Sequence, residues 1–254
     1  AAGNDLELVA LADVFEDKVW DCRNKLNKQR VEVPEANCFW GFDGYKSLLE
    51  VDLDIVILAT PPHFRPEHFD ACVQAKKHVF MEKPVCVDPV GARQIIATSK
   101  KAENIGITVI TGTQRRHQRD YVETYKQIAS GAIGELVAAK AWWLQSHVWF
   151  RTREEGWSDM EYMLRNWNNY CWLCGDHILD THVHNIDIIN WFMGKQPESA
   201  IGFGGRARRK TGDQYDFFSI DFEFGNGVYS HSMSRQIDDC ANTLGERIIG
   251  TEGY

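Results

Sequence analysis

An aspartate and a histidine stand four residues apart in the segment His177–Met193, whose composition predicts a helix. Residues at this spacing share one face of a helix, so Asp180 and His184 should lie side by side, with Asp187 continuing that face. A carboxylate beside an imidazole fixes its tautomer and stabilises its charged form. The pair is therefore a candidate for taking a proton from a hydroxyl group, although a surface ion pair or a satisfied core histidine has the same spacing.

The same segment also permits a metal site, because His177, Asp180 and His184 fall on one helical face and are zinc-ligand types. His182 cannot join His184 on one ion, since residues two apart point about 200° away from each other around a helix. Taken alone, the spacing of these residues leaves a zinc site open.

A charged pair, Glu82 and Lys83, stands immediately before Pro84, at the end of a strand that the apolar residues of His78–Glu82 predict. Buried charges are costly unless they are paired or used in chemistry. A lysine amine can exchange a proton with a substrate hydroxyl, so Lys83 is a second candidate catalytic residue. The alternative is an ion pair that only closes the strand.

These residues need a scaffold, and the first half of the chain contains short apolar strands that alternate with helices expected at 17–29, 67–77 and 89–103. The predicted strands are Leu6–Ala12, Asp54–Thr60, His78–Glu82 and Ile107–Thr111. Such alternation is typical of an α/β fold with a parallel sheet, Rossmann-like, covered on both faces. These sheets bind ligands at the carboxyl ends of their strands. Polar residues occupy all four of those ends, namely Asp13, Thr60, Glu82 and Gln114.

Asp13 ends the first predicted strand, where the acid of a dinucleotide-binding fold accepts hydrogen bonds from the adenosine ribose. A carboxylate there repels a 2′-phosphate and so favours NAD over NADP. An aspartate that only caps the next helix is the alternative. No G-x-G-x-x-G turn occurs in the chain, although the fold places one about 20 residues before such an acid. We therefore expect an internal piece of a longer polypeptide, which by itself binds NAD weakly or not at all.

The pattern changes after about residue 117, which predicts a partial dinucleotide-binding domain at 1–117 and a second domain at 118–254. Helices are expected at 120–130 and 177–193, and the rest alternates in a way typical of an α+β domain with a mostly antiparallel sheet. Gly225-Asn226-Gly227 between two alternating runs indicates a hairpin. The strands are predicted at 135–145, from 199 onward, and at 216–224, 228–235 and 246–250.

An irregular aromatic segment, residues 147–172, contains several tryptophans and three arginines. Aromatic rings provide flat walls on which sugar rings stack, and arginines between them bind polar or acidic substituents. Most tryptophans are core residues, so only a minority of these should touch a ligand. We name Arg165 and Trp167 as candidate substrate contacts.

Composition excludes several classes of partner. With 28 basic and 36 acidic residues the net charge is −8, a poor footprint for nucleic acid or an anionic membrane. The longest apolar run, Leu53–Ala59, is too short to span a bilayer. Seven scattered cysteines do not form a disulfide framework, and Cys171 and Cys174, although spaced as in redox or metal motifs, read as ordinary buried thiols.

Several motifs together resemble the glucose–fructose oxidoreductase and myo-inositol dehydrogenase family, often called Gfo/Idh/MocA. Each motif alone is common, but their order and separations match the family over nearly the whole chain. In chain order they are Ala59-Thr60-Pro61-Pro62-His63, Glu82-Lys83-Pro84, Gln114-Arg115-Arg116, and the segments at 130–135, 175–187 and 250–253.

The resemblance implies a Rossmann domain followed by a mostly antiparallel sheet domain, with NAD, less favourably NADP, oxidising a hydroxyl of a sugar, glycoside or cyclitol. It implies a catalytic set of Lys83, Asp180 and His184, in which Lys83 binds the reacting hydroxyl and the Lys83–Pro84 bond is cis. The family uses nicotinamide alone for its redox chemistry, so no metal is expected. Expected cofactor contacts are Asp13, Thr60, Pro61, His63, Glu82, Lys83, Gln114 and Arg115. Expected substrate contacts are Lys83, Arg165, Trp167 and His184.

Two other functions stay open. An NAD-dependent glycoside hydrolase would oxidise its sugar transiently and return the hydride, without net consumption of NAD. A non-catalytic sugar or nucleotide sensor would need no proton relay, so the presence of Lys83, Asp180 and His184 argues against it. We expect a cytoplasmic homo-oligomer, with export, the substrate and the reaction direction left open.

Overall fold

The computed structural model describes residues 6–254 and divides the chain into two compact units. The N-terminal unit comprises residues up to Thr60 together with 64–82 and 92–111. The C-terminal unit comprises 61–63, 83–91 and 112–254, so Lys83 packs with the second unit. No helix among the described residues is both long and apolar enough to cross a lipid bilayer.

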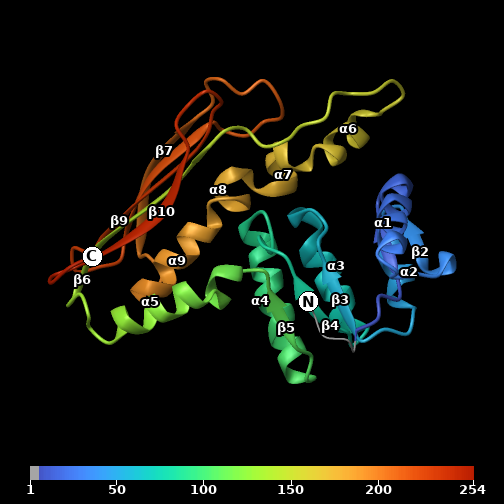
Figure 1. The fold of residues 1–254 in the computed structure, drawn as a ribbon, viewed down its shortest axis with the longest axis horizontal. Coiled ribbons are helices and arrows are strands. Elements are labelled where there is room, and N and C mark those ends of the chain that lie inside the picture. The colour runs from blue at the N-terminus through green and yellow to red at the C-terminus, as the bar shows by residue number, and fades with distance from the viewer. Residues whose placement is uncertain (1–5) are drawn as a thin grey trace. The chain divides into compact units, whose positions relative to one another are not determined.

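The N-terminal unit alternates strands and helices as the apolar pattern predicts (Figure 1). Its strands are β1 (Leu11–Asp13), β2 (Cys38–Trp40), β3 (Ile55–Leu58), β4 (His78–Met81) and β5 (Val109–Thr111). Its helices are α1 (Glu16–Lys28), α2 (Gly44–Leu49), α3 (Arg65–Gln74) and α4 (Pro89–Asn104). Short 3-10 turns lie at Glu35–Asn37 and Pro62–Phe64.

These strands are parallel, but within residues 6–254 they form two sheets rather than the single sheet that we predicted. β1 pairs with β2, with Asp13 opposite Trp40, while β4 lies between β3 and β5. The predicted strand Leu6–Ala12 is wrong over most of its length, since sheet pairing begins only at Leu11. Apolar character alone does not make a strand, because extended backbone needs a neighbour to accept its ladder hydrogen bonds.

The C-terminal unit contains α5 (Arg119–Ala129), α8 (Asp176–Asp180), α9 (Val183–Met193) and a five-stranded sheet. The strands are β6 (Leu136–Gln145), β7 (Ser199–Gly205), β8 (Phe217–Glu223), β9 (Tyr229–Gln236) and β10 (Thr243–Gly250). In the order β10-β6-β9-β8-β7, only β6 and β9 run parallel, which confirms a mostly antiparallel sheet. The aromatic segment is partly helical, since it contains α6 (Asp159–Arg165), a 3-10 turn at Trp167–Asn169 and the start of α7 (Cys171–Cys174).

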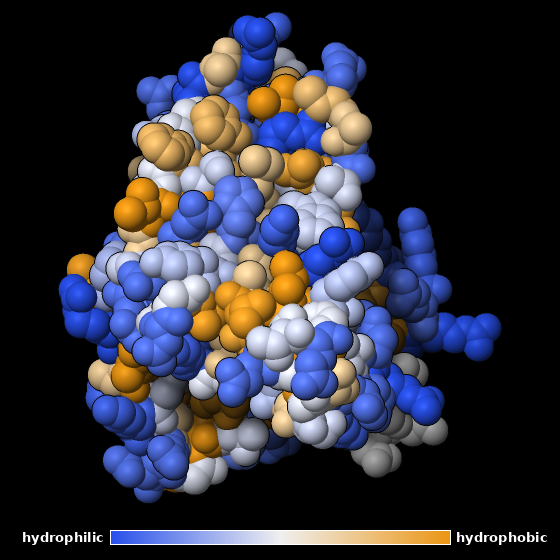
Figure 2. Space-filling view, turned by 90° about the vertical axis from the view of Figure 1, so that its left-hand side faces the viewer, coloured by the Kyte–Doolittle hydropathy of each residue, from blue (hydrophilic) through white to orange (hydrophobic). Residues whose placement is uncertain are grey.

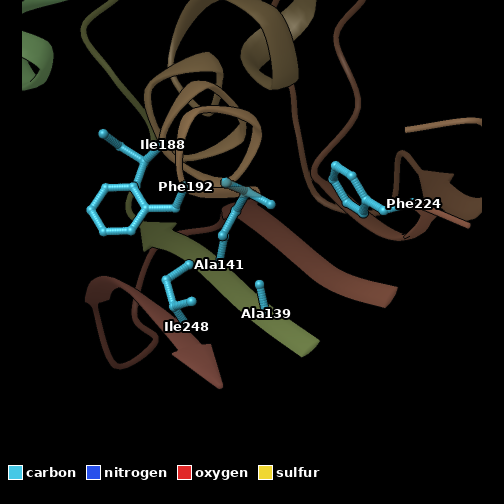
Figure 3. Packing of buried hydrophobic residues seen from close by; sticks show 7 residues of the cluster. Ala139, Ala141, Ile188, Phe192, Phe224 and Ile248 are labelled. Carbon is cyan, nitrogen blue, oxygen red and sulfur yellow. The ribbon is translucent and has the colours of Figure 1, made fainter. Parts of the chain in front are cut away.

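α9 packs against one face of this sheet and forms the main core of the unit (Figure 3). Alternate residues of β6, Ala139 and Ala141, face the helix because successive strand side chains point to opposite faces. Ile188 and Phe192, one helical turn apart on α9, belong to the same core cluster as these alanines. The small alanines allow the helix to approach the sheet closely, and this fixes the height of the helix that carries His184.

The predicted continuous helix His177–Met193 is wrong, because α8 ends at Asp180 and α9 begins at Val183. At the break, the backbone amide of His182 donates to the carbonyl of His177, five residues earlier. The His182 side chain is buried, and its Nε2 lies 2.6 Å from Ser232 Oγ on β9. This tertiary contact draws His182 toward the sheet and interrupts a segment whose local sequence favours one helix.

Candidate active site

Polar residues do occupy the carboxyl ends of the N-terminal strands, as we predicted. Asp13 is the last residue of β1, and its Oδ1 accepts a hydrogen bond at 2.9 Å from the Phe15 amide. Thr60 follows β3, with its Oγ1 3.2 Å from Nδ1 of His68. Burial lowers the pKa of His68 to about 4, so this imidazole is neutral at physiological pH. The ends of β1 and β3 therefore present a carboxylate, Asp13, and a hydroxyl, Thr60, with a neutral imidazole beside the hydroxyl.

Glu82 directly follows β4, and the chain around it is held by backbone contacts. Its amide donates to the Leu58 carbonyl at 3.0 Å, and its own carbonyl accepts from Nη1 of Arg65 at 2.9 Å. Arg65 is buried at the start of α3, with 3% of its surface exposed. The arginine therefore ties α3 to the end of β4, immediately before Lys83.

Lys83 and Asp180, 97 residues apart in the sequence, meet in the C-terminal unit. The ammonium group of Lys83 donates to the backbone carbonyl of Asp180 and lies 3.7 Å from its Oδ1. The two side chains retain 21% and 19% of their exposure, so water reaches both. The Lys83–Pro84 peptide is cis, as expected. The structure thus brings together two of the three residues that we predicted to be catalytic.

His184 lies in the first turn of α9, and its ring stacks on Trp143 of β6 at a centroid distance of 5.7 Å. Only 7% of its surface is exposed. Burial, followed by the positive charges of Lys83 and Arg115, lowers the pKa of His184 to about 4, against a smaller opposing effect of Asp187. The imidazole is therefore neutral at pH 7, the form that can accept a proton.

The predicted pairing of Asp180 with His184 does not have the expected geometry. The two residues lie on different helices, α8 and α9, so their spacing of four does not place them on one helical face. Asp180 interacts with Lys83 and, at 3.5 Å, with the Thr181 hydroxyl. Among the described residues, no hydrogen bond joins the side chains of Asp180 and His184. The carboxylate is thus placed to act on the lysine rather than to fix the tautomer of the imidazole.

The predicted cofactor residues Gln114 and Arg115 differ in their surroundings. Gln114 is exposed at the start of a 3-10 helix, Gln114–His117. Arg115 is buried, and its Nη1 donates to Oε1 of Glu246 on β10. Sequence reasoning missed Glu246, which also accepts hydrogen bonds from Tyr121 and Asn185. Of Glu246 and these two donors, only Asn185 lies in a segment that the sequence analysis identified as a family motif, residues 175–187.

The remaining predicted contacts lie in or against the aromatic segment. Nε of Arg165 donates to Oε1 of Glu161 at 2.9 Å, and its guanidinium lies 5.0 Å from the centre of the Trp157 ring. Trp167 is half-buried in a 3-10 turn. The exposed His63 meets this segment through Trp172, with ring centroids 5.1 Å apart. His63, which follows Pro61 and Pro62, therefore lies beside one aromatic wall.

His177, His182 and Cys174 are buried in the C-terminal unit. Burial lowers the pKa of His177 to about 3 and that of His182 to about 4. Burial also raises the pKa of the Cys174 thiol to about 12, as expected of an ordinary buried cysteine. In residues 6–254, no group of three or more His, Cys, Asp or Glu side chains is arranged to hold a metal ion.

Comparison with known proteins gives two family matches, one to each half of the chain. Residues 1–111 match the family model described as the Gfo/Idh/MocA oxidoreductase family, NAD-binding Rossmann fold. Residues 121–254 match the Gfo/Idh/MocA C-terminal domain. The two matches together cover nearly the whole chain.

Individual relatives are distant. The chain is 24% identical over 201 residues to a myo-inositol 2-dehydrogenase of Thermotoga maritima, covering 79% of this chain and 52% of that protein. It is 24% identical over 217 residues to the scyllo-inositol 2-dehydrogenase (NAD(+)) of Bacillus subtilis, covering 84% and 58%. The chain thus spans little more than half the length of these relatives. A myo-inositol 2-dehydrogenase structure from Lactobacillus plantarum shares the fold, with a TM-score of 0.77, 19% identity, and coverage of 98% of this chain and 68% of that one.

Proposed function

Because the chain belongs to the Gfo/Idh/MocA oxidoreductase family, we propose that it acts as an NAD-dependent dehydrogenase on a secondary hydroxyl of a cyclitol, sugar or glycoside. The observation that carries this proposal is the meeting of Lys83 with Asp180 in the unit that also holds the neutral His184. A neutral imidazole can accept the proton of a hydroxyl group, and an ammonium group can donate a hydrogen bond to its oxygen.

Each residue then has a defined task. The Lys83 ammonium donates a hydrogen bond to the hydroxyl oxygen and stabilises the negative charge that develops there. His184 accepts the proton in its neutral form. Asp180 orients Lys83 through its backbone carbonyl and its carboxylate, and the partial exposure of both side chains leaves the lysine within reach of a substrate. NAD, when bound, supplies the acceptor for the hydride of the carbinol carbon.

The N-terminal unit fits a dinucleotide at the ends of its strands, where parallel sheets bind nucleotides. Asp13 would hold the ribose hydroxyls of the adenosine, since its half-buried carboxylate terminates β1. Thr60 and Glu82 follow neighbouring strands and would line the same ligand. We assign further cofactor contacts to Pro61, His63, Lys83 and Gln114. For Arg115, the bond to Glu246 favours a supporting role over direct contact.

The substrate class follows from the aromatic surroundings in the C-terminal unit. Both named relatives act on inositols, which present a ring of hydroxyl groups. Trp172, beside His63, offers an aromatic surface for such a ring. Arg165 and Trp167 are proposed to contact the more distant hydroxyl groups or substituents.

We also propose a homo-oligomer that forms through the C-terminal sheet. Its face away from α9 exposes large apolar side chains, among them Ile201 and Phe203 of β7 at 75% and 76% and Tyr229 of β9 at 49%. Figure 2 shows apolar side chains gathered among polar ones on one side of the molecule. Exposed apolar clusters of this kind mark interaction surfaces, and size-exclusion chromatography with light scattering would test the assignment.

The experiment that tests the activity is NADH formation with a panel of inositols, sugars and glycosides. In the full-length protein we expect NADH with at least one polyol, and a preference for NAD over NADP that narrows in Asp13→Ser. Glycoside cleavage without net NADH would instead establish the hydrolase. If the protein binds a polyol but neither reduces NAD nor cleaves a glycoside, the sensor function replaces the proposal.

A further inference from the structure

Glu246 is a carboxylate enclosed by donors from three other elements of the C-terminal unit. Its Oε1 accepts from Nη1 of Arg115 and, at 2.6 Å, from Nδ2 of Asn185. Its Oε2 accepts from the Tyr121 hydroxyl at 3.0 Å. The side chains of Arg115 and Glu246 are each only 9% exposed. A charge this enclosed is tolerated because both of its oxygens are bonded and its partner carries the opposite charge.

The first link from Glu246 to His184 runs through the backbone of α9. Asn185 is the next residue after His184 and is completely buried. Besides the carboxylate, its Nδ2 reaches the backbone carbonyls of Gly245 at 3.2 Å and Trp142 at 3.4 Å. The first turn of α9 is thus fastened to β10 and β6 through one side chain.

The second link runs through Trp143. The guanidinium of Arg115 lies 5.4 Å from the centre of the Trp143 ring, the same ring on which His184 stacks. The guanidinium also lies 5.6 Å from the centre of the Tyr121 ring. Arg115 is therefore close enough for its charge to act on the imidazole. The bond to Glu246 fixes where that charge sits.

We propose that Glu246 is a positioning residue for His184: its carboxylate holds Asn185 and Arg115 in place and offsets the Arg115 charge beside the imidazole. Without the carboxylate, an uncompensated buried guanidinium would act on His184, and the first turn of α9 would lose an anchor. This inference rests on the proposed function only for its catalytic consequence. The predicted change in the titration midpoint of His184 does not depend on that function.

The charges that face His184 come from several elements. Lys83 precedes α4, Arg115 lies in the 3-10 helix and Asp187 lies on α9 itself; all three act on the imidazole. Asp180 of α8 neutralises Lys83, and Glu246 of β10 neutralises Arg115. Each cation that lowers the pKa of His184 is thus paired with its own carboxylate, and the two pairs can be perturbed separately.

The test is an NMR titration of isotope-labelled histidines in the full chain, with His184 identified by its loss in His184→Ala. Arg115→Gln should raise the titration midpoint of His184 by roughly one pH unit or more, because a cation is removed and a carboxylate is left beside it. Glu246→Gln should shift the midpoint in the opposite direction. The double variant Arg115→Gln/Glu246→Gln should return it to within a few tenths of a unit of the wild-type value.

Tyr121→Phe is the matched control, since it removes a hydrogen bond to the same carboxylate without removing a charge. The titration midpoint of His184 should be the same in Tyr121→Phe as in wild type. If both single variants shift the midpoint in the same direction, or if neither shifts it, Glu246 does not offset Arg115 and the proposal is overturned.

A second variant covers the case in which Glu246→Gln does not fold. Glu246→Asp keeps the charge on a shorter side chain, so the midpoint should stay near wild type while kcat falls about 10-fold or more and KM for NAD changes little. A shifted midpoint or an unchanged kcat contradicts the positioning role. If His184→Ala itself kept full turnover, the catalytic role proposed for His184 would fail, whereas the titration result would stand.

Discussion

Two pairs of opposite charges in the C-terminal unit differ in how much water reaches them. Lys83 and Asp180 keep about a fifth of their side-chain exposure and lie 3.7 Å apart between charged atoms. Arg115 and Glu246 keep 9% each, and the carboxylate has donors from Arg115, Tyr121 and Asn185. The accessible pair can exchange a hydrogen bond with a substrate. The enclosed pair has no such freedom and holds the neighbouring helix in place.

The exposure of each pair determines how much that pair contributes to the stability of the fold. Breaking a buried ion pair leaves an uncompensated charge, which is strongly destabilising. A pair within reach of water contributes far less to stability, because water replaces the lost partner. We therefore expect equivalent substitutions to lower turnover most in the accessible pair and the free energy of unfolding most in the enclosed pair.

The largest expected effect is on turnover. In the full-length enzyme, Lys83→Met and His184→Ala should each lower kcat by roughly 10²–10⁴-fold, the usual range for losing one acid–base group. Asp180→Asn should lower it less, since the Asp180 backbone carbonyl still accepts from Lys83. The measurement is initial-rate kinetics on the substrate identified in the polyol panel.

Lys126→Met is a suitable control, because Lys126 forms an exposed pair with Glu123 on the surface of α5. Its kcat should match wild type. Near-wild-type turnover in His184→Ala would show that α9 is structural, and the catalytic assignment would move to Lys83 alone or to the aromatic segment.

The next effect is on stability and separates the two pairs. Arg115→Met should lower the free energy of unfolding by about 3–5 kcal/mol, because Glu246 is left buried without its cation. Lys83→Met should lower it by about 1 kcal/mol or less. Urea denaturation of both variants under identical conditions measures the difference. Equal losses would mean that the contrast in exposure has no energetic consequence.

The smallest effect concerns pH. The folded-state pKa of His182 is about 4, below its ordinary value of 6.5, because burial penalises the charged form. Protonation therefore favours the unfolded chain: the stability from this histidine is complete above pH 6.5 and is lost as pH falls toward 4. Within that window one such histidine changes the free energy of unfolding by at most about 1.4 kcal/mol per pH unit.

Denaturation of wild type and His182→Asn between pH 7 and about pH 4 measures this contribution. The variant should show a shallower loss of stability on acidification than wild type, since one proton fewer is taken up on unfolding. His177 and His184, with pKa values also lowered by burial, should maintain the remaining slope. Parallel curves for the two proteins would show that His182 does not remain neutral in the fold.

Much of the fold could be predicted from local pattern. The helices α1, α3, α4 and α5 lie within a few residues of their predicted bounds, as do strands β3, β4 and β6. Gly131 and Gly194 follow the ends of α5 and α9, and both have the positive φ that is typical of a glycine after a helix. These features depend on residues close in sequence, for which apolar periodicity and glycine are sufficient signals.

The candidate site likewise has some features that follow from local sequence and others that depend on tertiary contacts. The sequence by itself determined that Lys83 follows a buried strand and that Asp180 and His184 lie in a helical region, because residue type and spacing are local properties. Only the tertiary structure decided that His182 turns toward Ser232 and breaks the helix, so that Asp180 serves Lys83. Likewise, only the pairing of β10 with β6 brings Glu246 to Arg115, 131 residues earlier. Bonds between such distant residues depend on packing that no local pattern encodes.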